Sequence, residues 1–162
     1  VLLEPIVGSS IDLNNLYNFY RCVVFYRMDA SEAADYVCQV AYKITPRALR
    51  KVINVGTTYE EHYAAFRTAF PIYSKVFDAV DSDILAEREL ATDMEMKRFN
   101  YLRAVELFKH GTPGFHTAAA FFLLKQYEMD DITRIIENVR YDRDRRSAAR
   151  YLTRPVMGGG GK

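Results

Sequence analysis

Histidines and neighbouring acids are the first residues in this sequence whose types could support metal or acid–base chemistry. His110 and His116 flank a Gly-Pro turn, and Glu60–His62 places two acids before a third histidine. Structural zinc needs four nitrogen or sulfur ligands, and no cysteine lies near these histidines in the sequence. The order Glu-Glu-His also differs from the His-Glu-x-x-His signature of zinc proteases. We therefore expect surface or capping histidines and no metal site.

A second set of acids, Glu128, Asp130 and Asp131, could form a carboxylate cluster on one helix. Di-metal helix bundles build their sites from paired Glu-x-x-His elements, and the sequence contains none. We interpret these acids as a solvated helix face. No nucleophile and base can be paired from spacing either, so we expect no catalytic residue, no metal ligand and no cofactor.

The glycines at 158–161 and Lys162 superficially resemble a phosphate-binding loop. Such a loop requires a Ser or Thr after the lysine and lies between a strand and a helix. Neither condition is met by this stretch, so residues 158–162 are predicted to be a flexible tail.

The basic end of the sequence is the clearest signal for another kind of partner. Arginines interleaved with aromatic residues can grip single-stranded RNA. Asp142 and Asp144 dilute this run, and the formal net charge of the whole chain is only +1. An RNA-binding module therefore stays a minor alternative. The residues concerned are Arg140, Arg143, Arg145, Arg146, Arg150 and Arg154, with Tyr141 and Tyr151.

These residues need elements to position them, and the strongest candidate is one long helix over Phe115–Tyr141. Its first half is apolar on every face around residues 118–124, so we expect other helices to surround it. Its second half narrows to an apolar stripe, with Asp130, Asp131, Arg134 and Glu137 predicted on the solvent side. The stripe consists of Met129, Ile132, Ile135, Ile136 and Val139.

The remaining elements also read as helices, and the fold class predicted is all-α. Start and stop signals come from a Ser at 31, a Thr-Pro at 45–46, a proline at 71 and the glycines and proline of 110–114. We predict a first helical lobe at 1–80, a long helical hairpin with the start of a further lobe at 81–157, and the tail. The helices are expected at about 11–27, 32–42, 46–55, 57–70, 82–110, 115–141 and 146–152.

Cysteine usage and hydropathy indicate the compartment. Cys22 and Cys38 sit among apolar neighbours, which predicts buried, reduced thiols in an intracellular protein. The longest apolar run is far shorter than the roughly 20 residues of a membrane-spanning helix. Because the sequence begins at Val1 rather than Met, we expect a fragment or a trimmed product.

An internal repeat appears at an offset of 116 residues. It places Asp12 over Glu128, Asn15 over Asp131 and Leu16 over Ile132, and Ser31 falls over Ser147 without a gap. Each copy has an acid, a short polar residue one helical turn later, and then an aliphatic stripe. A duplication is favoured, although any two amphipathic helices followed by capped helices could match in this way.

The stretch Phe121–Ile136 resembles a helix that recurs in the central-stalk subunit of the V-type and A-type rotary ATPases of bacteria, archaea and eukaryotes. The shared pattern is an apolar run, a Lys/Glu pair, then acid-x-x-Asn-Leu and an aliphatic stripe. Asp12, Asn15 and Leu16 match it more closely than the second copy, where Asp131 replaces the usual Asn. The family's Gly-Lys turn is also replaced here by Arg140–Arg143.

This resemblance implies three helical lobes arranged as a funnel, of which the chain would cover the later part. It implies a non-catalytic subunit that carries torque between the rotor axle subunits and the membrane proteolipid ring, for proton or sodium transport. The expected location is peripheral, on the cytoplasmic side of a membrane, with contacts through protein and without a small-molecule substrate. A helical scaffold outside this family is the main alternative.

Overall fold

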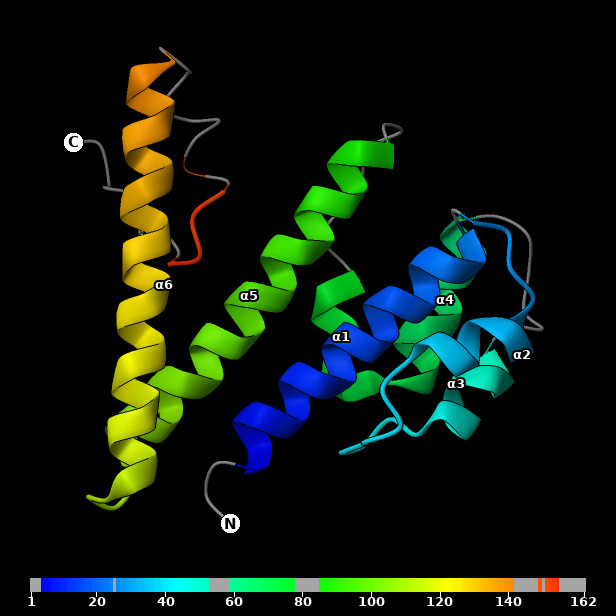
Figure 1. Ribbon diagram of the computed structural model, residues 1–162, viewed down its shortest axis with the longest axis horizontal. Helices are drawn as coiled ribbons and strands as arrows, with labels where there is room; N and C mark the ends of the chain where they lie inside the picture. Colours follow the sequence, from blue (N-terminus) through cyan, green and yellow to red (C-terminus); the bar gives the residue numbers. More distant parts are fainter. Residues whose placement is uncertain are drawn as a thin grey trace. The chain divides into compact units, whose positions relative to one another are not determined.

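The computed structural model describes residues 4–24, 26–52, 59–77, 85–141, 149 and 151–154, and these residues form helices and turns without any strand. The all-α prediction is confirmed. Contacts divide the chain into two compact units, Val1–Ala79 (unit 1) and Val80–Lys162 (unit 2). The elements of unit 1 are α1 (Glu4–Val24), α2 (Ala30–Ala33), the 3-10 helix η1 (Ala34–Tyr36), α3 (Pro46–Val52), α4 (Tyr59–Ala69) and the 3-10 helix η2 (Pro71–Phe77). Those of unit 2 are α5 (Leu85–His110) and α6 (Phe115–Arg140) (Figure 1).

Helix α1 is the centre of unit 1, and its start differs from the prediction. It begins at Glu4 rather than near Ile11, because Gly8, which was expected in a lead-in segment before the helix, lies inside the helix. A Cβ added at Gly8 would lie 2.4 Å from Cγ of Tyr42, so glycine here permits the close approach of an aromatic ring. The helix ends at Val24, and the chain then turns at Arg27, whose φ of 54° is left-handed.

The predicted second helix over 32–42 is wrong in its length and in its cap. The helical residues are Ala30–Ala33 and Ala34–Tyr36, after which the backbone is irregular as far as Thr45. Asp29, not Ser31, is the N-cap, and its Oδ1 accepts from the backbone N–H of Ser31 at 2.8 Å. The helix stops early because side chains of α1 bind the backbone of the following residues, as described below.

The Thr-Pro signal is confirmed as the start of α3. Thr45 Oγ1 accepts from the backbone N–H of Ala48 at 3.2 Å, and Pro46 occupies the first helical position. Helix α4 ends at Ala69, shortly before Pro71, as predicted. Its predicted starting residues, Thr57 and Thr58, lie outside the described residues.

The core of unit 1 forms where α4 and η2 cover α1. The ring of Phe66 lies 6.5 Å from that of Phe19 and 6.1 Å from that of Tyr20, both in edge-on geometry. Phe66 also stacks on Phe77 at 5.5 Å between centroids. The buried apolar side chains of α1 in this core include Leu13, Leu16, Phe19 and Tyr20, and those of α4 and η2 are Phe66, Tyr73, Val76 and Phe77.

Unit 2 is an antiparallel helical hairpin (Figure 1). Helix α6 spans Phe115–Arg140, which confirms the predicted long helix to within one residue. The backbone N–H of Gly111 donates to the carbonyl of Leu107 at 2.8 Å and closes α5 before the turn. The two helices meet through two ring pairs, Tyr101 with Tyr127 and Phe108 with Phe121, each 6.1 Å apart.

The predicted surroundings of α6 are wrong. Phe122, placed in the interior by its all-apolar neighbourhood, is 71% exposed, and the stripe of Met129, Ile132, Ile135, Ile136 and Val139 is exposed as well. Along α6 only Ala120 and Asp131 are buried. The reason is that the described residues cover α6 on the side that faces α5 and the 151–154 turn, and leave much of its apolar surface open.

Replacing Phe122 with aspartate is therefore expected to leave the fold intact, because the new charge would remain in water. The free energy of unfolding should change by no more than about 0.5 kcal/mol, as for ordinary surface substitutions. Chemical denaturation followed by circular dichroism measures this change. A collapse of the helical signal would show that another element covers this part of α6.

The cysteines also differ from expectation. Both are free, but Cys38 is exposed and Cys22 is only half-buried. Cys38 is exposed because it lies in the irregular segment after η1 rather than in the predicted helix.

Candidate functional site

Asp12, on α1, is a fully buried carboxylate that holds two distant segments of unit 1. Its two oxygens accept from the backbone N–H groups of Tyr42 at 3.0 Å and Lys43 at 2.8 Å. The hydroxyl of Tyr73 donates to the same carboxylate at 2.9 Å. Hydrogen bonds from these three donors satisfy the oxygens of the buried carboxyl group. Asp12 thus joins α1 to η2 and to residues 37–45, which connect η1 to α3 and are called the irregular segment below.

Asn15 lies one turn further along α1 and binds the same irregular segment. Its Oδ1 accepts from the backbone N–H of Cys38 at 2.8 Å, while its Nδ2 donates to the carbonyl of Cys38 at 3.0 Å. Nδ2 also lies 3.4 Å from the carbonyl of Val40. Because an amide both donates and accepts, Asn15 can satisfy the donor and the acceptor of one residue.

Asp131 makes the corresponding contact in unit 2, which corrects its prediction as a solvated acid. It is 8% exposed, and its two oxygens accept from the backbone N–H groups of Thr153 at 2.8 Å and Arg154 at 3.0 Å. Arg134 donates to the carbonyl of Tyr151 at 2.6 Å, and Arg98 donates to the carbonyl of Leu152 at 3.2 Å. Donors and acceptors of the 151–154 turn are therefore bound by side chains of the hairpin.

In both units, the same number of residues separates the binding side chain on the helix from its backbone partner. Asn15 binds the backbone of Cys38, and Asp131 binds the backbone N–H of Arg154; both partners lie 23 residues further along the chain. The offset of 116 residues found in the sequence aligns both the binding side chains and their backbone partners. This agreement supports a duplication over a chance match of two amphipathic helices.

The first position of the motif differs between the copies. Glu128 stands where Asp12 does, but its carboxylate binds Lys125 Nζ at 2.6 Å and its side chain is 53% exposed. The hydrogen bond from Lys125, together with the charge of that ammonium, lowers the pKa of Glu128 from its usual value. The residues aligned with Tyr42 and Lys43 are at 158 and 159, outside the part of the chain that is described.

Replacing Asp131 with alanine is expected to release the 151–154 turn, because two backbone N–H groups lose a charged acceptor. The local loss of stability should be about 3 kcal/mol, since hydrogen bonds to charged groups contribute about 1.5 to 3 kcal/mol each. Hydrogen exchange followed by mass spectrometry should show faster exchange at Thr153 and Arg154. Exposed Asp130 is the control, and its replacement with alanine should leave this exchange unchanged.

The other residues considered from the sequence do not assemble into a reactive site in the described part of the structure. No group of three or more potential metal ligands is found among the residues searched. The side chain of His62 and the glycines of 158–161 lie outside the described residues. Of the basic end, Arg140 lies over the ring of Tyr141 at 5.8 Å, while Arg143, Arg145, Arg146 and Arg150 are not described.

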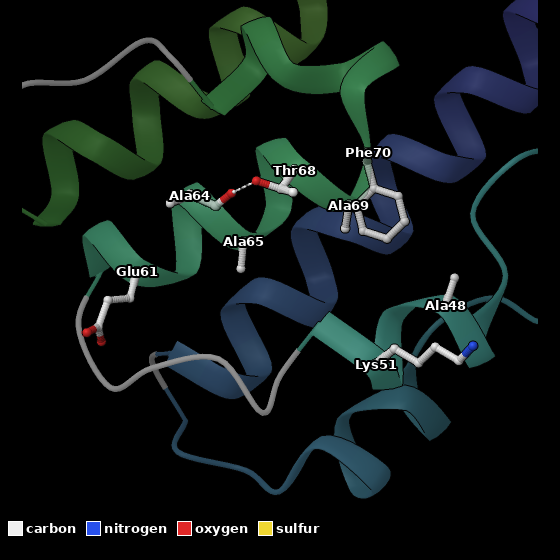
Figure 2. A pocket seen from close by; sticks show the side chains of 8 residues that line it. All are labelled: Ala48, Lys51, Glu61, Ala64, Ala65, Thr68, Ala69 and Phe70. Carbon is white, nitrogen blue, oxygen red and sulfur yellow. Dashed lines mark hydrogen bonds between the residues drawn. The ribbon is translucent and has the colours of Figure 1, made fainter.

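A groove that the sequence did not reveal lies between α3 and α4 in unit 1 (Figure 2). Its volume is about 600 Å³, and small side chains dominate its wall. The hydroxyl of Thr68 is turned back onto its own helix, donating to the carbonyl of Ala64 at 2.9 Å. Lys51 and Glu61 are the charged residues at this groove, and they offer no paired nucleophile and base. The lining residues are Ala48, Lys51, Glu61, Ala64, Ala65, Thr68, Ala69 and Phe70.

A second groove, of about 710 Å³, lies in unit 2 beside α6, and it is described further below. Both grooves are lined mainly by apolar and aromatic groups. Among the described residues, no helix combines the length and the apolar character needed to cross a bilayer.

Comparison with protein families matches residues 2–151 to the family described as ATP synthase (C/AC39) subunit. Comparison with curated proteins and with solved structures finds no significant match. The family match spans both units and includes both copies of the motif, from Asp12 and Asn15 to Asp131. The chain belongs to the ATP synthase (C/AC39) subunit family.

Proposed function

We propose that this chain is a non-catalytic central-stalk subunit of a V-type or A-type rotary ATPase. It couples the rotor axle to the membrane proteolipid ring and so transmits torque during proton or sodium transport. The family match over residues 2–151 is the observation that carries this proposal. In this role, the chain contacts its partner subunits and stiffens the stalk, and it supplies no reacting group.

The structure supplies physical properties that suit this role. Helices α5 and α6 have 26 residues each, or about 39 Å at about 1.5 Å per residue, and they brace one another as a hairpin. In unit 1, the carboxylate of Asp12 ties α1, the irregular segment and η2 to one point. Cross-links of this kind resist relative movement of the segments that they join. We propose that unit 1 is one lobe and that unit 2 contains the start of the next.

The partners that follow from this proposal are the axle subunits and the proteolipid ring. Attachment to the membrane would be peripheral, on its cytoplasmic side, and made through protein contacts. The exposed apolar residues of the hairpin and the alanine-lined groove of unit 1 provide surfaces for such contacts.

Affinity purification of the tagged protein from its native membranes in mild detergent tests this proposal. Mass spectrometry should identify axle subunits and a proteolipid among the retained proteins, and an untagged preparation provides the control. A wash at high salt separates specific partners from weakly bound acidic molecules, because charge contacts at exposed surfaces are screened. Recovery of RNA or of soluble proteins alone would contradict a stalk function.

A further inference from the structure

The groove beside α6 exposes large apolar side chains in the described part of unit 2. Isoleucine side chains of α6 and the side chain of Leu152 form its apolar part, and α5 adds aromatic rings. Glu128, Lys125 and Arg154 place charged groups around it. Ile132 is 50% exposed and Ile135 is 46% exposed, so large apolar side chains meet solvent here.

The same positions in unit 1 are buried. Leu16 and Phe19 correspond to Ile132 and Ile135 through the offset of 116 residues, and both are fully buried. Asp12 corresponds to Glu128 and is also fully buried. One structural motif is therefore covered in unit 1 and open in the described part of unit 2.

The cover in unit 1 has a definite chemistry. Phe66 of α4 places its ring against Phe19, and Phe77 of η2 stacks on Phe66. Tyr73 of η2 is fully buried and donates its hydroxyl to Asp12 at 2.9 Å. The covering segment, residues 59–77, is thus an α-helix followed by a 3-10 helix, and the 3-10 helix presents the hydroxyl of Tyr73 to a carboxylate.

We propose that the groove beside α6 is a docking site for a helical polypeptide segment with the aromatic pattern of residues 59–77. Its phenylalanine rings would cover Ile132 and Ile135, and its tyrosine hydroxyl would donate to Glu128. This inference goes beyond the stalk function, because it concerns a segment that completes unit 2 and not the identity of the axle or the ring.

Two observations determine the kind of occupant. Glu128 is an acceptor at the position that receives a tyrosine hydroxyl in unit 1, so the occupant should carry a donor there. A second copy of this chain cannot provide residues 59–77 without exposing its own core, since Phe66, Tyr73 and Phe77 are buried in unit 1. The occupant is therefore a different segment of the same chemistry, not an intact second copy.

Two fluorescein-labelled synthetic peptides, with the sequences of residues 59–77 and 46–77, are the probes for this site. Fluorescence anisotropy should show saturable binding to the 162-residue chain. Ile135→Asp should weaken binding at least tenfold, because it places a charge in the apolar part of the groove. Val40→Asp is the matched control, since Val40 is 62% exposed in unit 1, and it should not alter binding.

The tyrosine contact is tested separately by a double-mutant cycle. A peptide with Tyr73→Phe should bind several-fold more weakly to the unchanged chain, and this difference should vanish on the Glu128→Ala chain. Circular dichroism checks that each variant retains its helices. The proposal is overturned if neither peptide binds up to about 1 mM, a limit corresponding to weak association. It is also overturned if light scattering shows a dimer of the chain that Ile135→Asp dissociates, because the occupant would then be a second copy.

Discussion

Replacing Asp12 with alanine is expected to lower the free energy of unfolding of unit 1 by about 4 kcal/mol, because two part-buried backbone N–H groups and one buried hydroxyl lose the same acceptor. These donors are the backbone N–H groups of Tyr42 and Lys43 and the hydroxyl of Tyr73. Each buried polar group that loses its partner costs about 1 to 3 kcal/mol. Urea denaturation followed by circular dichroism measures the loss.

The repeat provides a matched control for this substitution. Glu128→Ala removes the carboxylate at the corresponding position of α6, where the side chain is exposed and pairs only with Lys125 at 2.6 Å among the hydrogen bonds described. An exposed ion pair of this kind contributes little, so no measurable loss of stability is expected. Equal losses for the two variants would contradict the difference between a covered motif and an open one.

The second large effect is expected for Phe19→Ala. Phe19 is fully buried and its ring meets Phe66 edge-on at 6.5 Å, so truncation removes apolar contact and leaves a cavity. Substitutions of buried phenylalanine by alanine cost about 3 to 5 kcal/mol. The midpoint of urea denaturation should fall while the steepness of the transition is retained.

Ile135→Ala is the matched control for Phe19→Ala at the equivalent repeat position. Because Ile135 is 46% exposed, its truncation should cost less than about 1 kcal/mol in the chain alone. A loss as large as that of Phe19→Ala would mean that the apolar stripe of α6 is already covered. The docking site proposed for the groove would then be filled by the chain itself.

The helices and several of their ends could be predicted from local chemistry. Pro46 and the turn at Gly111 act within a few residues, and the structure places α3, α5 and α6 where these signals indicate. The start of α1 was predicted too late, because a helical glycine that allows the ring of Tyr42 to approach cannot be told in sequence from a glycine in a loop before the helix. Only the fold brings Tyr42 to that position.

The burial of particular faces could not be predicted from periodicity. A stripe such as Ile132 and Ile135 indicates an apolar face, but it does not say which segment covers that face or whether any does. Asp131 was predicted to be solvated, yet it is buried because its Oδ1 accepts a hydrogen bond from the backbone N–H of Thr153, in a turn 22 residues further along the chain. One signal was available: Asp12, Asn15, Leu16 and Phe19 follow the 3, 4, 7 spacing of a single helix face. In both copies the polar residue at the second position of this spacing, Asn15 or Asp131, is buried and accepts from backbone N–H groups.

The coupling role itself is tested most directly in reconstituted vesicles. The rotary ATPase is assembled with and without this subunit, and ATP hydrolysis and ion uptake are measured on the same preparation. Without the subunit, we expect ATP hydrolysis to continue while ATP-driven ion uptake is lost, and uptake should return when the subunit is added back. Ion uptake that persists at its full rate in the complex lacking the subunit would contradict the proposed function.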